Sequence, residues 1–337
     1  MSSSMVQCLS CRSRDLVPVL SLGHQPLANR LLRADDLDQD EPKYPLSVAV
    51  CRACWLLQLE RTVSPELLFD LYAYASSTVI GFQAHFDNLA STLKRRLRLD
   101  QRSLVVEPGS NDGILQRPLK AMGIRSVGVE PAENLCHRAW AEGLETINGY
   151  FGNQIISKIG EESADAVVAC NVFAHNPNIH AFADTVAQIL RPGGSFVVEL
   201  CYLGDMLRDL TWDAIYFEHI FYWSLTSLAR LLKEHDLVLT DVEAIPTHGG
   251  SFRVWSIKQG QNKMSQSAIQ WLDSERRSGM LDISNYTRFA ERVAEFQERF
   301  SRRVHQLASQ GKRIVGYGSP AKATTLLNAC EISTEDI

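Results

Sequence analysis

Alternating apolar and helical segments in the middle of the chain constrain its fold more than any other feature. A short apolar strand is expected at residues 104–107, opening into a glycine turn and then an apolar helix at about 114–122. Further strands are expected at 126–129, 165–170 and 195–200, and a helix at 179–190 ends in RPGG. Strands and helices that alternate with short connections predict an α/β fold with a doubly wound, mostly parallel sheet, which binds ligands at the carboxyl ends of its strands.

The loop after the first of these strands has the sequence EPGSNDG, from Glu107 to Gly113. Its glycines let the backbone approach a ligand closely, and the helix that follows offers unpaired amide groups. The spacing is not the GxGxxG of dinucleotide-binding loops. Glu130 ends the second strand, where an acid in such a sheet holds ribose hydroxyls and rejects a ribose phosphate. Taken alone, the loop is equally compatible with a tight turn that binds nothing.

Two CxxC motifs near the N-terminus, Cys8 with Cys11 and Cys51 with Cys54, predict a metal site. One tight turn directs both thiolates of a CxxC motif at the same ion, and two such turns complete a tetrahedral sulfur site for zinc. All four ligand positions would be filled by protein, so the predicted role of the zinc is structural. Buried apolar thiols are the alternative for these cysteines, and the expectation for the four others: Cys136, Cys170, Cys201 and Cys330.

The bulk composition excludes several classes of protein. A chain of 337 residues with 45% hydrophobic content is long enough for two or three packed units. The formal net charge of -5 gives no broad basic surface, so nucleic-acid binding is not expected. Neither an apolar leader nor a stretch of about 20 apolar residues is present, which predicts no membrane segment and a cytoplasmic protein.

The order of the loop, the acid after the second strand and RPGG resembles class I S-adenosylmethionine-dependent methyltransferases over roughly residues 102–200. The resemblance implies that the loop wraps the methionine part of the cofactor and that Glu130 holds its ribose. It assigns these residues to cofactor binding, together with Asn171 after the third strand: Glu107, Gly109, Ser110, Asn111, Asp112, Gly113 and Glu130.

Further motifs extend the resemblance over almost the whole chain. In order, the chain contains the CxxC pairs, YAYASS (72–77), EPGSNDG, NVFAH (171–175), DAIYFEHIFYWS (213–224), THGGSFRVW (247–255) and GYGSPAKATTLLNAC (316–330). This series resembles the zinc-containing sugar C-methyltransferases that act on nucleotide-linked 4-keto-deoxysugars. The resemblance makes Tyr216 and Glu218 partners of His219, and adds His175 and Tyr74 to the reaction centre.

The chemistry of such a reaction needs one base and good alignment. A 4-keto group acidifies the hydrogen on the neighbouring carbon, so a positioned base can form an enolate that attacks the methyl group of S-adenosylmethionine. Histidine suits this task because its pKa lies near neutrality, and an adjacent tyrosine or glutamate can orient it or stabilise the oxyanion. His219 is therefore the predicted base. Each of the five candidates also has an ordinary structural interpretation, as a packing aromatic, a surface acid or a turn residue.

Substrate contacts are expected from two later segments. In THGGSFRVW, Gly249 and Gly250 allow close approach of the backbone; Ser251 lies beside them, and Arg253 is either a planar partner for a diphosphate or a charge on a strand surface. In the 316–330 segment, a short strand, a glycine turn and a helix predict a phosphate site near Ser319 or Lys322, or simply a second small α/β unit.

Three regions are expected along the chain: a zinc-binding unit at 1–63, a methyltransferase domain at 64–255, and a helical linker with a partial C-terminal α/β subdomain at 256–337. The linker helix carries an apolar stripe that is expected to be core: Phe289, Val293, Phe296 and Phe300. Members of the resembled family usually continue beyond the last motif, so the subdomain looks truncated, and a partner chain or self-association there is an open expectation.

Three other functions stay open at this point. A class I methyltransferase could act on a different small-molecule acceptor, because fold does not choose substrate. An NAD-linked oxidoreductase is disfavoured by the glycine spacing. A non-catalytic scaffold that uses zinc to bind a protein is disfavoured by the combination of EPGSNDG and the YxEH cluster.

Overall fold

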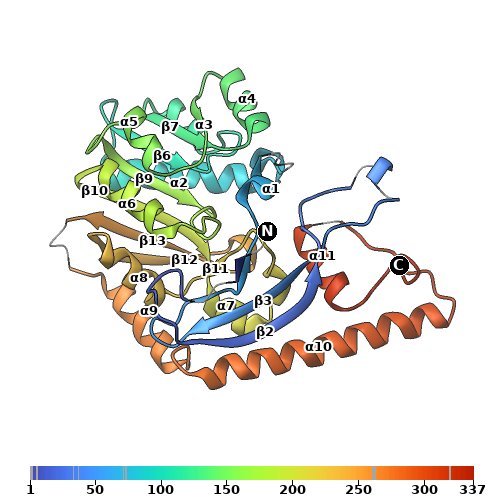
Figure 1. Ribbon diagram of the computed structural model, residues 1–337. Coiled ribbons are helices and arrows are strands. Elements are labelled where there is room, and N and C mark those ends of the chain that lie inside the picture. Colours follow the sequence, from blue (N-terminus) through green and yellow to red (C-terminus); the bar gives the residue numbers. More distant parts are fainter. Residues whose placement is uncertain are drawn as a thin grey trace.

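A computed structural model describes residues 3–4, 7–32, 34–36, 38–70, 72, 74–259, 263–318 and 320–337. Its centre is a seven-stranded sheet with the order β12-β13-β10-β9-β6-β7-β8 (Figure 1). Five strands are parallel, and β13 runs antiparallel to both of its neighbours. The strands are β6 (Leu104–Pro108), β7 (Arg125–Glu130), β8 (Glu145–Asn148), β9 (Ala164–Cys170), β10 (Leu190–Cys201), β12 (Leu237–Ile245) and β13 (Ser251–Lys258). The predicted mostly parallel sheet is confirmed.

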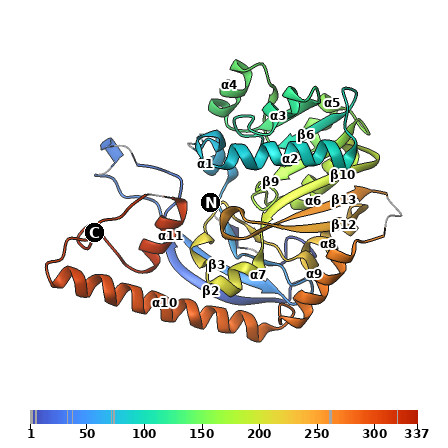
Figure 2. The ribbon, with the colours of Figure 1, turned by 180° about the vertical axis from the view of Figure 1, so that it is seen from behind.

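Helices cover both faces of this sheet. They are α2 (Phe82–Leu97), α3 (Gln116–Ala121), α4 (Glu133–Ala141), the short η3 (Asn153–Ile155) and α5 (Ile156–Ile159), α6 (Ile179–Ile189) and α8 (Leu225–Glu234). Val105 packs in one cluster with α2 and α3, whereas Val106 packs in another with α6. Successive strand residues point to opposite faces, and both faces are buried, so the strands are apolar throughout. Figure 2 shows α2 running across the face opposite to that seen in Figure 1.

The β10 strand begins earlier than the sequence indicates. Residues of RPGG, expected to form a turn, lie within β10, whose pairing with β9 shifts register between Leu190 and Ser195. The shift accommodates the glycines: Gly193 has a φ of 72°, and a side chain on Gly194 would meet backbone oxygens at 2.9 and 3.1 Å.

A second, four-stranded antiparallel sheet has the order β11-β4-β3-β2. Three strands come from the N-terminal region, but β11 comes from the segment that carries the predicted base, and it pairs through Phe221 with Gln58 and Tyr222 with Leu57. The sheet therefore crosses the expected boundary at residue 63. The elements of this region are β1 (Ser3–Ser4), β2 (Leu16–Gln25), η1 (Ala34–Asp36), β3 (Tyr44–Cys51), β4 (Leu57–Leu59), β5 (Arg61–Thr62), α1 (Pro65–Phe69), η2 (Ser76–Thr78) and β11 (Phe221–Tyr222).

Six further helical elements of the described chain connect strands of the central sheet or follow its last strand in the sequence. They are α7 (Leu203–Asp209), η4 (Trp212–Ala214), η5 (Thr247–Gly249), α9 (Gln266–Arg277), α10 (Ile283–Ser309) and α11 (Ala321–Ala329). The long α10 runs beside β2 along one side of the molecule, and α11 packs against β2 and η4 (Figure 1). The carbonyl oxygen of Ile215, just after η4, accepts a hydrogen bond of 3.0 Å from the hydroxyl of Thr325 on α11.

The expected core stripe of α10 is only half correct. Phe289 and Val293 are buried, but Phe296 is 37% exposed and stacks on Phe300 with ring centroids 5.8 Å apart. The reason is visible in Figures 1 and 2, where the second half of α10 extends past the body of the protein.

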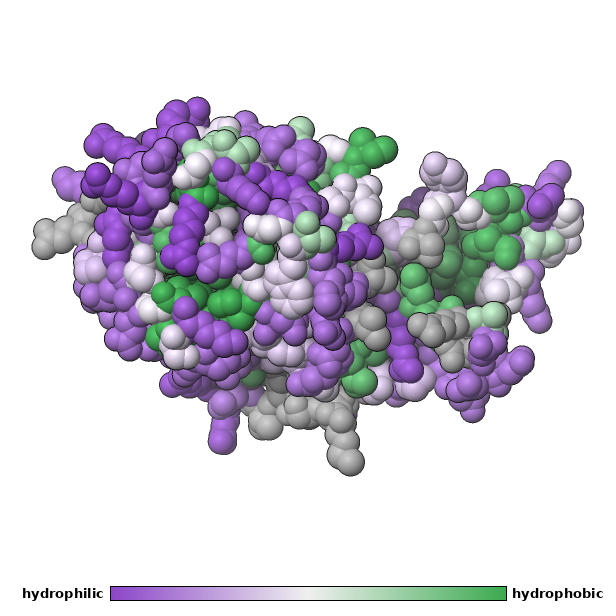
Figure 3. Space-filling model, turned by 90° about the horizontal axis from the view of Figure 1, so that it is seen from above, coloured by the Kyte–Doolittle hydropathy of each residue, from purple (hydrophilic) through white to green (hydrophobic). Residues whose placement is uncertain are grey.

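The strand expected just before α11 is not formed. Residues 312–318 form neither a helix nor a strand, no strand of the described chain pairs with them, and Val315 and Tyr317 are largely or fully exposed. A strand needs a neighbour for its backbone groups, and this segment has none in the described residues. Figure 3 shows hydrophobic side chains gathered on the lobe that the loop after β2 and the C-terminal segment form.

None of the helices in the described part of the chain combines the length and apolar character needed to cross a membrane.

Candidate active site and metal centre

The four N-terminal cysteines converge on one point. Their sulfur atoms lie within 4.8 Å of one another, with Cys8 3.6 Å from Cys54 and Cys11 3.5 Å from Cys51. The two turns are alike: the amides at Arg12 and Trp55 donate to the carbonyls of Cys8 and Cys51, and both residues have a φ of 62°. Each CxxC motif is thus a tight turn that directs two thiols at a shared centre.

The chemistry of this donor set requires a cation. The thiol of Cys54 donates to Cys8 and lowers the Cys8 pKa to about 5, and the same contact raises the pKa of Cys54. Burial raises the pKa of Cys11 to about 11. Four thiolates this close cannot all ionise without a positive charge between them, and zinc supplies it in a tetrahedral sulfur site. The residues fit a structural zinc ion.

The cofactor loop lies between β6 and α3. Glu107 is 3% exposed at the end of β6, and burial together with the charges of Glu130 and Asp112 raises its pKa well above the usual value. The carboxylate of Glu130 accepts the amides of Asn111 and Ala132, both at 2.9 Å. These bonds fix the orientation of Glu130 at the end of β7, where its remaining lone pairs can accept hydroxyl groups.

Three buried oxygens of this loop have no hydrogen-bond partner within the described residues: Glu107 Oε2, Ser110 Oγ and Asp112 Oδ1. Buried polar atoms in native proteins are normally paired, so such a group of orphans indicates a missing polar ligand. The backbone is also closely packed here, because a side chain on Gly109 would lie 2.6 Å from Val172 and one on Gly113 would lie 2.3 Å from Leu144. The loop therefore fits a polar cofactor that approaches the backbone.

Gly128 belongs to the same cradle and was missed from the sequence. A side chain at this position on β7 would meet the Ser110 hydroxyl at 2.3 Å and Gln116 at 2.6 Å. The glycine lies inside an apolar strand, and an isolated glycine in a strand is the signal that marks close approach of another group.

The YAYASS segment closes over the cofactor loop. Asn111 accepts the amide of Ser76 at 2.8 Å and donates to the carbonyl of Tyr74 at 3.0 Å, and Ser77 donates to Asp112. The Tyr74 ring packs edge-on against Tyr72 at 6.2 Å and is 37% exposed. Two of the predicted cofactor residues thus hold a predicted reaction-centre segment in place.

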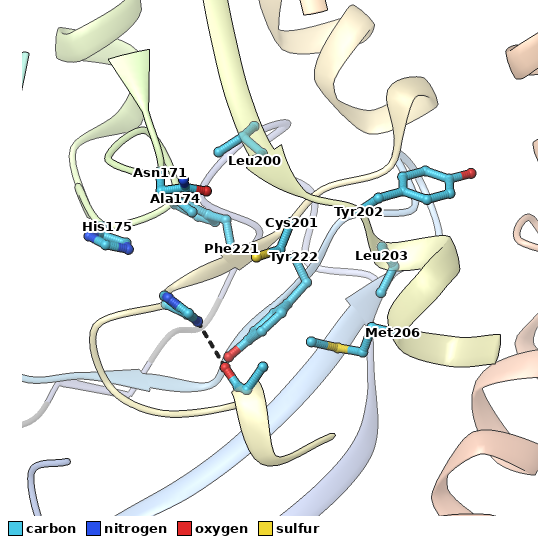
Figure 4. A pocket seen from close by; sticks show the side chains of 12 residues that line it. Asn171, Ala174, His175, Leu200, Cys201, Tyr202, Leu203, Met206, Phe221 and Tyr222 are labelled. Atoms are coloured by element: carbon cyan, nitrogen blue, oxygen red, sulfur yellow. Dashed lines mark hydrogen bonds between the residues drawn. The ribbon is translucent and has the colours of Figure 1, made fainter. Parts of the chain in front are cut away.

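The YxEH cluster places His219 in a defined tautomer. Its Nδ1 lies 2.9 Å from the carbonyl oxygen of Ala214, which can only accept, so Nδ1 carries the hydrogen (dashed in Figure 4). Nε2 then has a free lone pair and accepts from the hydroxyl of Tyr216 at 3.0 Å. Burial lowers the pKa of His219 to about 4, so the ring is neutral at physiological pH.

His175 stacks on His219. Their ring centroids are 5.1 Å apart, with an angle of 25° between the ring planes. The ring of Phe69 also stacks on His175, with a centroid distance of 5.8 Å. Burial, followed by the neighbouring His219 and His248, lowers the pKa of His175 well below its usual value. The structure therefore brings the histidines of NVFAH and YxEH into one stack of neutral rings.

Glu218 faces two partners that sequence reasoning missed. The carboxylate is 2% exposed and accepts Asn29 at 2.5 Å and the Tyr72 hydroxyl at 3.0 Å. Burial raises the pKa of Glu218, and the two hydrogen bonds oppose the rise. Tyr72 lies inside the YAYASS motif and could have been found there, whereas no sequence signal marks Asn29, which is 189 positions from Glu218.

A pocket lies where these groups meet, beside the carboxyl ends of β9 and β10 (Figure 4). Asn171 lines it and also adjoins Val172, which packs on the cofactor loop, so the pocket is next to the predicted cofactor site. Its lining residues are Asn171, Ala174, His175, Leu200, Cys201, Tyr202, Leu203, Met206, Ala214, His219, Phe221 and Tyr222. Cys201, expected to be buried without function, is therefore a pocket residue, whereas Cys136 and Cys330 are buried as predicted.

The predicted substrate residues have different surroundings. Burial raises the pKa values of Cys201 and Asp213. The positive charge of Lys322, on α11, lowers both pKa values and so opposes this rise. Gly250 has a φ of 121°, and a side chain there would meet Asp205 at 2.3 Å. Ser251 donates to the carbonyl of Thr247 at 2.9 Å. Ser319 lies outside the described residues.

Arg253 is already paired. Its guanidinium donates to Glu199 at 2.6 Å and to Glu243 at 3.1 Å, and Glu199 also lies 2.8 Å from Nε2 of His85. Arg253 is 3% exposed and Glu199 1%. The sequence left two interpretations of Arg253, a diphosphate partner or a charge on a strand surface. The geometry favours neither, because Arg253 on β13 forms ion pairs with Glu199 on β10 and Glu243 on β12.

Comparison with known proteins covers the whole chain. The model of a zinc binding domain matches residues 8–69, that of a methyltransferase domain matches 82–242, and that of a C-methyltransferase C-terminal domain matches 246–337. The C-methyltransferase NovU of Streptomyces niveus is 35% identical in an alignment 338 positions long, which covers 98% of this chain and 80% of that protein.

The fold and the site define a class I S-adenosylmethionine-dependent methyltransferase with a zinc centre. Within that class, the chain belongs to the C-methyltransferases that carry an N-terminal zinc binding domain, as the motifs predicted. The enzyme transfers a methyl group from S-adenosylmethionine to carbon and carries a structural zinc ion.

Two further matches cover smaller shares of the chain. The mitochondrial ubiquinone biosynthesis O-methyltransferase of Homo sapiens is 31% identical over 102 residues, 28% of this chain and 27% of that protein. The magnesium protoporphyrin IX methyltransferase of Synechocystis PCC 6803, solved with bound S-adenosylhomocysteine, is 13% identical with a TM-score of 0.42, covering 53% of this chain and 84% of that one.

Replacing Cys51 by serine is expected to release the zinc ion and to lower stability, because a structural site contributes its binding free energy to folding. Zinc content by elemental analysis and the midpoint of thermal unfolding measure the two effects. Cys330→Ser, at a cysteine outside the cluster, is the control and should keep one zinc ion per chain. A zinc-free Cys51→Ser protein of unchanged stability would contradict a structural role.

Replacing Arg253 by methionine is expected to lower the free energy of unfolding by about 3 kcal/mol, because it leaves Glu199 buried without its cation. Urea unfolding measures the change. Arg276→Met removes an ion pair whose side chains are 64% and 49% exposed, and should cost less than about 1 kcal/mol. Unchanged stability of Arg253→Met together with weaker nucleotide binding would instead return Arg253 to the substrate site.

Stability is expected to fall as the pH drops from 7.5 to 5.5. His219 has a lower pKa in the folded protein than the ordinary 6.5, so above pH 6.5 both states are neutral and below it only the unfolded chain gains the proton. At pH 5.5 this costs about 1 kcal/mol for His219. Unfolding free energies of the wild type, His219→Asn and the exposed-site control His137→Asn measure it, with zinc content checked at each pH. Equal pH slopes in all three proteins would contradict the assignment.

Proposed function

We propose that this methyltransferase acts on a nucleotide-linked keto-deoxysugar and methylates the carbon next to its 4-keto group. The observation that carries the proposal is the fixed tautomer of His219, a residue that lines a pocket next to the cofactor loop and whose unprotonated Nε2 is hydrogen-bonded to Tyr216. The similarity to C-methyltransferase NovU over 98% of the chain supports carbon as the acceptor atom. The order of the motifs supports the class of sugar.

The proposed reaction begins with proton abstraction by His219. Nδ1 stays bonded to the Ala214 carbonyl, so the ring keeps its orientation, and Nε2 takes the proton from the carbon beside the ketone. Because burial keeps the ring neutral, the base is ready at physiological pH. The electrons of the broken C–H bond form the enolate.

Methyl transfer completes the reaction. S-adenosylmethionine, held by the loop from Glu107 to Gly113 and by Glu130, supplies an electrophilic methyl group. The enolate carbon forms a bond to this methyl group while the carbon–sulfur bond breaks, and the electron pair stays on sulfur. Asn171 stands between the cofactor loop and the pocket and is proposed to align the two reactants.

The other reaction-centre residues are proposed to position His219 and the sugar. Tyr216 occupies Nε2 of His219 in the free enzyme and yields it to the substrate. His175 stacks on His219 and restricts its ring. Glu218, held by Asn29 and Tyr72, is proposed to accept a sugar hydroxyl, and Tyr74 to cover the site from the YAYASS segment.

The phosphates of the nucleotide are proposed to lie toward Lys322. This ammonium group is the cation whose charge reaches Cys201 in the pocket wall, and no ion pair of the described residues uses it. Ser319, Gly250 and Ser251 complete the proposed substrate contacts, whereas Arg253 is omitted because Glu199 and Glu243 occupy it. We also infer a cytoplasmic location, in keeping with eight cysteines that form no disulfide.

His219→Asn is expected to abolish turnover and to leave binding of S-adenosylhomocysteine nearly unchanged, because asparagine keeps a polar side chain but offers no base. Methyl transfer to a nucleotide-linked 4-keto-deoxysugar is followed by mass spectrometry, and cofactor binding by calorimetry. Exchange of the sugar C–H for deuterium from solvent, followed by NMR with S-adenosylhomocysteine bound, isolates the proton abstraction. This exchange should also stop in His219→Asn.

The control is His137→Asn, at a histidine whose side chain is 65% exposed on α4, and it should behave as the wild type. Full activity of His219→Asn would remove His219 from the role of base. A wild-type enzyme that methylates another small molecule but no nucleotide-linked ketosugar would leave the methyltransferase assignment intact and overturn the proposed acceptor.

A further inference from the structure

Tyr222 places a buried hydroxyl group in the wall of the pocket. The residue belongs to β11, is 4% exposed, and lines the pocket together with His219. Its O–H group has no hydrogen-bond acceptor in the described part of the chain. Neither the sequence motifs nor the proposed mechanism has given this hydroxyl a role.

A second unpaired polar atom faces the same pocket. Nε2 of His175 is also buried without a partner among the described residues. Much of the remaining lining is apolar, including Leu200, Leu203 and Met206. In Figure 4 the ring of Tyr222 lies between His175 and Met206. Buried polar atoms without partners are costly, so two of them on one apolar pocket indicate that a bound molecule supplies the missing partners.

The hydroxyl stays protonated and can therefore donate a hydrogen bond. Burial raises the pKa of Tyr222 well above the usual value, whereas a weak hydrogen bond from the Tyr216 backbone amide to the hydroxyl oxygen lowers it. Tyr222 therefore keeps its proton at physiological pH, and an oxygen atom of the ligand is the group that it can bind.

We propose that Tyr222 donates a hydrogen bond to the carbonyl oxygen of the acceptor and stabilises the negative charge that forms there when His219 removes the proton. The inference rests on the proposed function and extends it by one residue. The C–H electrons become the new C–C double bond, the carbonyl electron pair moves onto oxygen, and the proton passes to Nε2 of His219. Tyr222 keeps its own proton throughout. A donor aimed at a developing oxyanion lowers the barrier because it needs no reorganisation at the moment of reaction.

The test is Tyr222→Phe, which removes one oxygen atom and keeps the ring. Deuterium exchange at the carbon beside the ketone and kcat for methylation should both fall on the order of 10²-fold. Binding of S-adenosylhomocysteine should not change. The thermal midpoint of the ligand-free protein should stay the same or rise, because the variant loses a buried O–H group that has no acceptor.

Tyr286→Phe is the matched control. Tyr286 is equally buried, but its hydroxyl donates to the carbonyl of Met280 at 3.0 Å and lies outside the pocket lining. This variant should lower the thermal midpoint and leave exchange and kcat as in the wild type. The pair thus separates loss of a structural hydrogen bond from loss of a contact with the substrate.

The outcomes distinguish this inference from the proposed function. Normal exchange and kcat in Tyr222→Phe would overturn the role of Tyr222 while the function stands. If the wild type fails to methylate any nucleotide-linked ketosugar, the proposed function is wrong. The thermal midpoint of ligand-free Tyr222→Phe then shows whether the Tyr222 hydroxyl is a structural group or a ligand contact. A lower midpoint of Tyr222→Phe would then show a structural hydroxyl and overturn the inference, whereas an equal or higher one would support a ligand contact.

Discussion

The pairing of β11 with β4 determines where the proposed catalytic groups lie. The segment that carries His219 is held on one side by the amide of Leu59, which donates to Ile220 at 2.9 Å. On the other side, the carbonyl of Ala174 accepts the amides of Ile220 and Phe221 at 3.0 and 3.3 Å. A chain that would otherwise be a loop is thereby fixed between the zinc-bearing sheet and the NVFAH segment. The geometry of His175, His219 and Tyr222 depends on these few backbone bonds.

The zinc centre contributes to the active site through this same sheet. Cys51 ends β3, and Cys54 precedes β4, so the ion holds β3 to β4, the strand that pairs with β11. A second connection runs from the zinc turn through side chains: the carbonyl of Ser10 lies 2.7 Å from His180, which contacts His235 at 2.8 Å. The zinc unit thus packs directly against the segment that carries His219 and is not a separate appendage.

Burial and charge are distributed differently in the two halves of the site. At the cofactor loop, several carboxyl groups are buried close together. Their unpaired oxygens can accept hydrogen bonds from hydroxyl or ammonium groups of the cofactor. In the acceptor pocket, the histidines are neutral and Lys322 is the nearby cation. A neutral imidazole can accept a proton at physiological pH without prior deprotonation, as the proposed role of His219 requires.

The sequence by itself determined the α/β sheet, the zinc ligands and the family, because these depend on local patterns: apolar strands, paired cysteines and short motifs in a fixed order. It also named His219, His175 and Glu218, although not how they contact one another. Only the tertiary structure decided that Asn29 and Tyr72 hold Glu218, that Arg253 is buried against Glu199, and that Tyr222 faces the pocket. Those contacts join residues far apart in the chain. Strand pairing and helix packing bring these residues together, and a local sequence pattern does not predict which distant residues will meet.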